Sequence, residues 1–135
     1  MIKNYLQIFT LFSCIVLLFH CSNRNSIPNI ETKDFNENYI SVDVDSPNPE
    51  YAAMYQLLFR GIEGSSQKVP LISVSETSAI NSNPAYFDSF FKKERYKTFV
   101  TSSTNSGKGV RRVVINLRAL KLDLEYHAII KKFGY

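Results

Sequence analysis

The chain has 135 residues, of which 44% are hydrophobic, and a formal net charge of +4. Both cysteines, Cys14 and Cys21, lie near the N-terminus, which excludes a disulfide framework or a cysteine-based zinc site in the rest of the chain. The length suits one small domain, and the many Tyr and Phe residues allow it to fold on a hydrophobic core alone.

The first 21 residues have the layout of an export signal. Lys3 precedes an apolar run of about 14 residues from Leu6 to Phe19, and polar residues follow from Ser22 onward. The run is short for a membrane-spanning helix, which needs about 20 residues. The pattern therefore predicts a secretory signal rather than part of a folded domain.

This segment resembles the signal peptide of bacterial lipoproteins. In that family a leucine stands three residues before a lipid-accepting cysteine, as Leu18 does before Cys21, whereas Phe19 and His20 are bulkier than the family's residues at those positions. The resemblance implies cleavage of residues 1–20 as a signal peptide. It also implies acyl chains on the new N-terminal cysteine and attachment to a membrane of the bacterial cell envelope.

Two alternatives to this anchor remain open. The lipidated cysteine could be Cys14, which has Leu11 and Ser13 in suitable positions, or the segment could be an uncleaved signal anchor in which both cysteines are inert. The residue after Cys21 is Ser22 and not an aspartate. By the family's sorting rule this favours the outer membrane over the inner one.

Charge is distributed unevenly along the remaining chain. Residues 22–91 contain four basic and nine acidic residues, a net charge of −5, whereas residues 92–135 contain eleven basic and three acidic residues, a net charge of +8. One interpretation is charge complementarity within a single domain. The other is a basic face for an anionic partner such as lipid or lipopolysaccharide. Nucleic acid is not expected as a partner, because an exported lipoprotein rarely meets any.

Residues 21–38 are polar and nearly without apolar periodicity, which predicts a flexible tether. A single α+β domain is expected over residues 39–135. It begins with a strand over Tyr39–Asp45, in which apolar and polar residues alternate. A helix follows, because Asn48 and Pro49 are typical of a helix start. Its apolar face is formed by Tyr51, Met54, Tyr55, Leu58, Phe59 and Ile62, and Gly61 and Gly64 end it.

The middle of the chain gives weaker signals. Ser65–Asn83 is expected to be a loop with a short edge strand near Val69–Val74. A second cap-and-proline signal at Pro84 predicts a short helix over Ala85–Lys93. Its aromatic residues at helical spacing are Tyr86, Phe87, Phe90 and Phe91.

The pattern in the last third of the chain predicts a hairpin followed by a helix. Arg95–Ser102 and Val110–Arg118 alternate as antiparallel strands around a polar, glycine-containing connection. Val113, Ile115 and Leu117 are expected to face the core. Ala119–Phe133 is expected to form the final helix. The predicted fold class is α+β, with a small, mostly antiparallel sheet of three to four strands packed by about three helices.

Residues with a recognisable chemical pattern are few downstream of Cys21. His127 has no other histidine or cysteine near it in sequence with which to form a metal site or a catalytic pair. Asp43 and Asp45 share one face of their strand, as paired carboxylates of a hydrolase would. The glycines at 107 and 109 lack the spacing of a phosphate-binding loop. No catalytic residue, metal site or cofactor is therefore assigned.

Basic residues on the predicted hairpin are candidates for anion binding. They are Lys108, Arg111, Arg112 and Arg118. Tyr96 and Phe99 lie among further basic residues and are candidates for stacking on a ligand. The alternative is that the charges prevent the strands from pairing with neighbouring molecules.

The leading functional hypothesis is a membrane-anchored envelope lipoprotein that acts as a non-enzymatic binding or accessory module for an envelope protein or glycan. One alternative is a small envelope hydrolase or enzyme subunit with Asp43 or Asp45 as acid or base. Another is an anion-binding surface for lipid or lipopolysaccharide. The sequence carries no signal for a particular oligomeric state.

Overall fold

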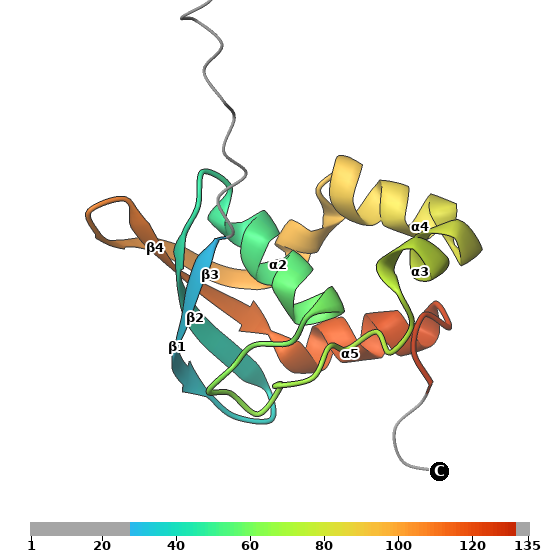
Figure 1. The fold of residues 1–135 in the computed structure, drawn as a ribbon, viewed down its shortest axis with the longest axis horizontal. Helices are drawn as coiled ribbons and strands as arrows, with labels where there is room; N and C mark the ends of the chain where they lie inside the picture. Colours follow the sequence, from blue (N-terminus) through green and yellow to red (C-terminus); the bar gives the residue numbers. More distant parts are fainter. Residues whose placement is uncertain (1–27, 132–135) are drawn as a thin grey trace, which may run out of the picture.

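The computed structural model describes residues 28–131, which form a four-stranded antiparallel sheet with helices gathered on one side (Figure 1). The strands lie in the order β1-β2-β4-β3. They are β1 (Asn29–Phe35), β2 (Tyr39–Asp45), β3 (Val100–Gly107) and β4 (Val110–Asn116). The α-helices are α2 (Pro49–Phe59), α3 (Glu76–Ser82), α4 (Pro84–Phe87) and α5 (Leu117–Tyr126). The predicted α+β class is confirmed.

Residues 28–131 also contain helical segments of two other types. The π-helix η1 (Asp88–Lys92) continues α4, and the 3₁₀ helix η2 (Arg95–Phe99) precedes β3. In Figure 1, α3 and α4 lie at the end of the molecule away from the β3–β4 turn. No helix within residues 28–131 combines the length and the apolar character needed to cross a membrane.

Alternation along the central strands decides which face of the sheet is buried. Ile40 pairs with Ile115 and Val42 pairs with Val113 across β2 and β4, and all four side chains are fully buried. From α2, the core receives Ala53, Met54, Leu57 and Leu58, and from α5 it receives Leu117, Leu120 and Leu124. Burying one large aliphatic side chain contributes about 1.5 to 3 kcal/mol, so this layer is sufficient to hold helices and sheet together.

The flexible tether predicted over residues 21–38 is wrong for residues 29–35, which form β1. This edge strand pairs antiparallel with β2, from Asn29 opposite Asp45 to Phe35 opposite Ile40. Thr32 fastens it further, because its hydroxyl donates to the carbonyl oxygen of Glu63 at 2.6 Å. Polar residues suffice at an edge, where much of the strand faces solvent. The domain therefore includes β1, and residues 1–27, with the expected signal peptide and Cys21, lie outside the described residues.

The edge strand predicted near Val69–Val74 is also wrong. This stretch has no strand; its backbone instead attaches to the end of α2, with the Leu71 N–H donating to the Leu57 carbonyl at 3.2 Å. The helix α3 then forms within the predicted loop. It begins after Ser75, whose side chain accepts a hydrogen bond from the Ser78 N–H at 3.2 Å. Such a cap satisfies one of the free N–H groups of the first turn.

Replacing Ser75 with alanine is expected to lower the free energy of unfolding by about 1 kcal/mol, because the first turn of α3 loses its cap. Ser73→Ala is the matched control, since Ser73 is exposed and its side chain makes no hydrogen bond within the described residues. Urea denaturation of both variants measures the difference. Equal stabilities would show that the cap contributes nothing to the fold.

The strand predicted over Arg95–Ser102 starts only at Val100. Tyr96 and Phe99 are both buried, and in a 3₁₀ helix residues three apart lie on the same side. Alternation would have placed them on opposite faces. At its C-terminal end, β3 is longer than the predicted strand, because it continues past Ser102 to Gly107. Only Lys108 and Gly109 form the turn of the hairpin.

The last helix spans Leu117–Tyr126 and is shorter than the predicted Ala119–Phe133. Asn116 caps it, since its side-chain oxygen accepts a hydrogen bond from the Ala119 N–H at 2.9 Å. Ala128 has φ +56°, in the left-handed region that ends helices, and the Ile129 N–H returns to the Leu124 carbonyl at 2.8 Å. The helix therefore ends before Phe133, which lies outside the described residues.

Candidate functional site

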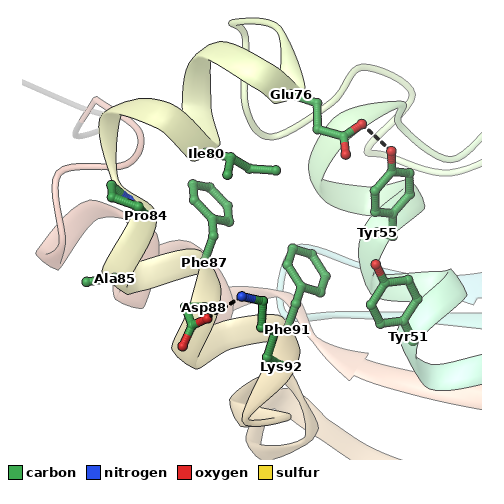
Figure 2. A pocket seen from close by; sticks show the side chains of 10 residues that line it. All are labelled: Tyr51, Tyr55, Glu76, Ile80, Pro84, Ala85, Phe87, Asp88, Phe91 and Lys92. Atoms are coloured by element: carbon green, nitrogen blue, oxygen red, sulfur yellow. Dashed lines mark hydrogen bonds and ion pairs between the residues drawn. The ribbon is translucent and has the colours of Figure 1, made fainter.

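An open pocket of about 570 Å³ lies between α2, α3, α4 and η1 (Figure 2). We call it the aromatic pocket. Its lining consists of Tyr51, Tyr55, Glu76, Ile80, Pro84, Ala85, Phe87, Asp88, Phe91 and Lys92. The volume falls in the range of sites for small ligands, about 300 to 1,000 Å³, and such sites combine apolar walls with a few polar groups.

One wall comes from a stripe of aromatic residues on α2. Tyr51, Tyr55 and Phe59 are four residues apart, so they lie on one side of the helix. The Tyr51 and Tyr55 ring centroids are 6.1 Å apart in a stacked arrangement. The neighbouring stripe, which includes Ala53 and Leu57, is buried in the core. The helix α2 is therefore fixed on the sheet by one stripe and presents its tyrosines to the pocket with the other.

The facing wall comes from α4 and η1. The Phe87 and Phe91 rings are nearly parallel, with centroids 6.3 Å apart, and Phe91 contacts Tyr51 at 5.2 Å between centroids. The Lys93 N–H donates to the Asp88 carbonyl at 3.2 Å, which closes the wide turn of the π-helix. Such turns are rare and are found frequently at functional sites. Here the turn carries Phe91 to the pocket while Phe90 is fully buried in the core.

The polar groups of the pocket are two tyrosine hydroxyls, a carboxylate and an ion pair. The Tyr55 hydroxyl donates to the Glu76 carboxylate, as the dashed line in Figure 2 shows. Burial first, and then the negative charge of Glu76, raise the pKa of Tyr51. Burial and the hydrogen bond to Glu76 also raise the pKa of Tyr55, against the opposing effect of Arg60. Both hydroxyls therefore stay protonated at neutral pH, and the Tyr55 hydroxyl, which donates to Glu76, still has an oxygen that accepts hydrogen bonds.

The ion pair lies at the rim of the pocket. The Lys92 ammonium is 2.7 Å from an Asp88 carboxylate oxygen, and the lysine side chain is 81% exposed. An exposed pair of this kind contributes about 0 to 1 kcal/mol to stability. Its relevance is electrostatic, because it neutralises both charges.

A second polar cluster, formed by Tyr86, Arg95 and Asp123, joins α5 to α4 and η2. The Asp123 carboxylate accepts hydrogen bonds from the Tyr86 hydroxyl and the Arg95 guanidinium, both at 2.8 Å. Burial by itself raises the pKa of Asp123, but the hydrogen bonds from Arg95 and Tyr86 outweigh it and lower the pKa. Arg95 also lies over the Tyr86 ring, 4.8 Å from its centroid. All three groups are satisfied by one another, so we regard the cluster as structural.

The four basic residues predicted to bind anions are not brought together. Lys108 is in the hairpin turn and Arg118 is on α5, at opposite ends of the seven-residue β4, about 23 Å long. Arg111 and Arg112 are neighbours on a strand and point to opposite faces. Arg111 donates to the Ser103 carbonyl at 2.7 Å, and Arg112 forms two hydrogen bonds with the Asp43 carboxylate at 2.7 and 2.9 Å.

The carboxylates considered for a hydrolase are placed on the solvent side of the sheet. The hydrogen bonds from Arg112 lower the pKa of Asp43, and Lys33 lies 3.7 Å from the same carboxylate. Asp45 is exposed at the end of β2. His127 makes a contact of 2.9 Å between its Nδ1 and the Asp123 carbonyl oxygen. Within residues 28–131, no group of three or more His, Cys, Asp or Glu is arranged to hold a metal ion.

The expectation that Tyr96 and Phe99 stack on a ligand is wrong. Tyr96 is 4% exposed and Phe99 is 8% exposed, because both rings pack in the core. The aromatic residues with accessible surface at a pocket are instead those of α2 and η1. Local periodicity places both sets of aromatic residues on apolar helix faces and gives no indication that Glu76 or Ile80 lies beside them. The pair Ser75 and Glu76, a capping residue followed by an acid, was the available signal for α3.

The aromatic pocket is the feature of the described structure best suited to a ligand, because it joins accessible rings to polar groups that have hydrogen-bonding capacity to spare. Arg111 of the hairpin lines a pocket of about 260 Å³, which has less than half the volume of the aromatic pocket. Comparisons with models of protein families, with curated proteins and with solved structures find no match for this chain.

Proposed function

We propose that the protein is a membrane-anchored lipoprotein of the bacterial cell envelope that acts as a non-enzymatic binding module, with the aromatic pocket as its binding site. The observation that carries the second part is the pocket itself, open to solvent and lined by rings from two helical segments with Glu76 at its wall. Aromatic side chains provide large contact areas for a ligand, and the tyrosine hydroxyls provide orientation. The anchor is supported by the resemblance of residues 1–21 to lipoprotein signal peptides.

The pocket is formed by elements that the core holds rigidly. Phe87 and the neighbouring Phe90 are buried, and Phe59 and Phe91 pack against the same core cluster. A site on helices fixed in this way changes little when a ligand binds, which reduces the entropic cost of binding. The pocket is therefore expected to be present before the ligand arrives.

Lipid attachment is tested by replacing Cys21 with serine. The unmodified chain is expected to incorporate a labelled lipid precursor and to stay in the membrane fraction, and Cys21→Ser is expected to lose both properties because serine lacks the acceptor thiol. The matched control is Cys14→Ser, which should keep the label. A label that survives Cys21→Ser and disappears in Cys14→Ser would move the attachment site, and a chain that is never labelled would contradict the anchor.

Binding at the pocket is tested with 2-phenylethanol, an aromatic ring with one hydroxyl. The variant Phe91→Leu keeps an apolar side chain but removes the central ring, and the affinity is expected to fall about tenfold because ring contacts are worth about 0.5 to 1.5 kcal/mol beyond their area. Ligand-observed NMR titration gives the affinities. Phe35→Leu is the control, since Phe35 is a 42% exposed ring on β1, outside the pocket. Equal affinities of the two variants would place binding elsewhere.

A further inference from the structure

The charged groups of the aromatic pocket leave one negative charge uncompensated. Its lining contains two carboxylates, Glu76 and Asp88, and one cation, Lys92. Asp88 and Lys92 neutralise each other at 2.7 Å. Glu76 has no ion-pair partner within residues 28–131. Among the lining residues, Glu76 is therefore the charged group that no other lining residue neutralises.

The Glu76 carboxylate also has unused hydrogen-bonding capacity. Its side chain accepts a bond from the Tyr55 hydroxyl, and no other partner is found for it in the described part of the chain. A carboxylate offers about four acceptor positions, so further donors can be accommodated. Arg60, the residue that follows α2, lies over the Tyr55 ring at 5.8 Å from the centroid and forms no ion pair with Glu76 within residues 28–131.

The ring faces of the pocket favour the same kind of ligand. Aromatic rings carry a negative potential on their faces and attract cations, most strongly where water is partly excluded. Tyr51, Tyr55 and Phe91 pack into one continuous wall, with centroid distances of 5.2 to 6.3 Å. Glu76 extends from α3 beside this wall (Figure 2). The carboxylate and the rings therefore both attract positive charge.

We infer that the aromatic pocket binds a small organic ammonium ion that carries an apolar or aromatic group. The ammonium donates to the Glu76 carboxylate, and the apolar group contacts Phe87, Phe91 and Ile80, which line the part of the pocket beside Glu76 and Tyr55 (Figure 2). A neutral ligand with a hydroxyl would gain the apolar contacts and a hydrogen bond to Glu76, but not the attraction between opposite charges. An anionic ligand would be repelled by Glu76. This inference rests on the proposed function, since it names the ligand class of the same pocket.

The test compares three probes of similar size and different charge: the phenethylammonium ion, neutral 2-phenylethanol and anionic phenylacetate. Charge-assisted hydrogen bonds are about twice as strong as neutral ones, so phenethylammonium is expected to bind about tenfold more tightly than 2-phenylethanol. Phenylacetate is expected to bind most weakly. Titrations at low ionic strength, followed by NMR, give the three affinities.

A variant then assigns the preference to Glu76. Glu76→Gln is expected to remove the preference, so that the variant binds phenethylammonium and 2-phenylethanol about equally tightly, and unchanged NMR signals of amides far from the pocket show that the variant is folded. Glu63→Gln, a change at an exposed glutamate that does not line the pocket, is expected to keep the preference.

The outcomes separate this inference from the proposed function. Equal affinities of the chain for phenethylammonium and 2-phenylethanol would overturn the ammonium inference and leave the pocket as a neutral binding site. A preference that persists in Glu76→Gln would also overturn it. Failure of all three probes to bind would overturn both the inference and the assignment of the pocket as the binding site.

Discussion

Replacing Gly61 with alanine is expected to lower the free energy of unfolding by about 2 to 4 kcal/mol. Gly61 follows α2 and has φ +81°, a conformation that L-residues rarely adopt. A Cβ at this position would lie 2.1 Å from the carbonyl oxygen of Lys68. The overlap is with backbone and not with the end of a mobile side chain, so the loop after α2 would have to move.

That movement would break contacts that hold the loop together. The Ile62 N–H donates to the Gln67 carbonyl at 2.8 Å, and the Gln56 side chain donates to the Gly61 carbonyl at 3.1 Å. The same loop leads to the stretch that attaches to the end of α2 and then to α3. Gly61→Ala is therefore expected to disturb the α3 wall of the pocket as well as the stability.

Urea denaturation measures the effect, and Gly64→Ala is the matched control in the same loop. Gly64 also has a positive φ, +72°, but a Cβ there would meet only the Thr32 side chain at 3.7 Å, an ordinary contact. Its cost is expected to be about 1 kcal/mol, from the backbone conformation alone. Equal losses in the two variants would contradict the close approach of Gly61 to Lys68.

The second large effect is expected for Asp123→Ala, which should cost about 2 to 3 kcal/mol because it removes the acceptor shared by Tyr86 and Arg95. The Tyr86 hydroxyl and the Arg95 guanidinium would then lose partners at 2.8 Å in a part-buried setting. Asp88→Asn is the control, since it breaks an exposed pair with Lys92 and should cost less than about 1 kcal/mol. Similar losses in both variants would mean that the Asp123 cluster does not stabilise the fold.

The same carboxylate makes stability depend on pH. Folding lowers the pKa of Asp123, so its contribution is present above the unfolded value of about 3.9 and is lost as pH falls through the folded pKa. The stability difference between the unmodified chain and Asp123→Ala is therefore expected to shrink below about pH 4. Asp43 and Asp88, whose pKa values are also lowered, remain in both proteins. Denaturation curves between pH 7 and pH 2 test this, and a constant difference would contradict it.

The elements that could be predicted from sequence are those with a strong local pattern. The strand over Tyr39–Asp45 has strict alternation, and its apolar residues are the fully buried ones of β2. The helix beginning at Pro49 has a proline where the first turn accepts one. Asn48 lies at the cap position, but its side chain makes no capping hydrogen bond.

The elements that could not be predicted owe their structure to contacts distant in sequence. β1 is polar and exists because it pairs with β2. Polar and aromatic residues in the segment Arg95–Phe99 follow one another much as in a strand. The burial of Tyr96 and Phe99 on one side of the segment nevertheless favours a 3₁₀ helix. Tertiary packing overrides local propensity in such cases.

The pocket was hidden for the same reason. Its rings lie on α2 and on the segment formed by α4 and η1. Local periodicity places the aromatic residues of both segments in the core, but it does not show that the two segments meet at a pocket. Glu76 lies on a helix that was not predicted. The anion site on the hairpin was suggested by charge alone, and the structure gives Arg111 and Arg112 separate partners on opposite faces.

The most direct test of the pocket as the binding site is to add 2-phenylethanol to the protein and to map, by NMR, which backbone amides of residues 28–131 change their chemical shift. The shifted amides are expected to cluster on α2, α3 and η1, around Tyr55, Glu76 and Phe91. Shifts that cluster on the β3–β4 hairpin around Lys108 and Arg111, or no shifts at all, would contradict it.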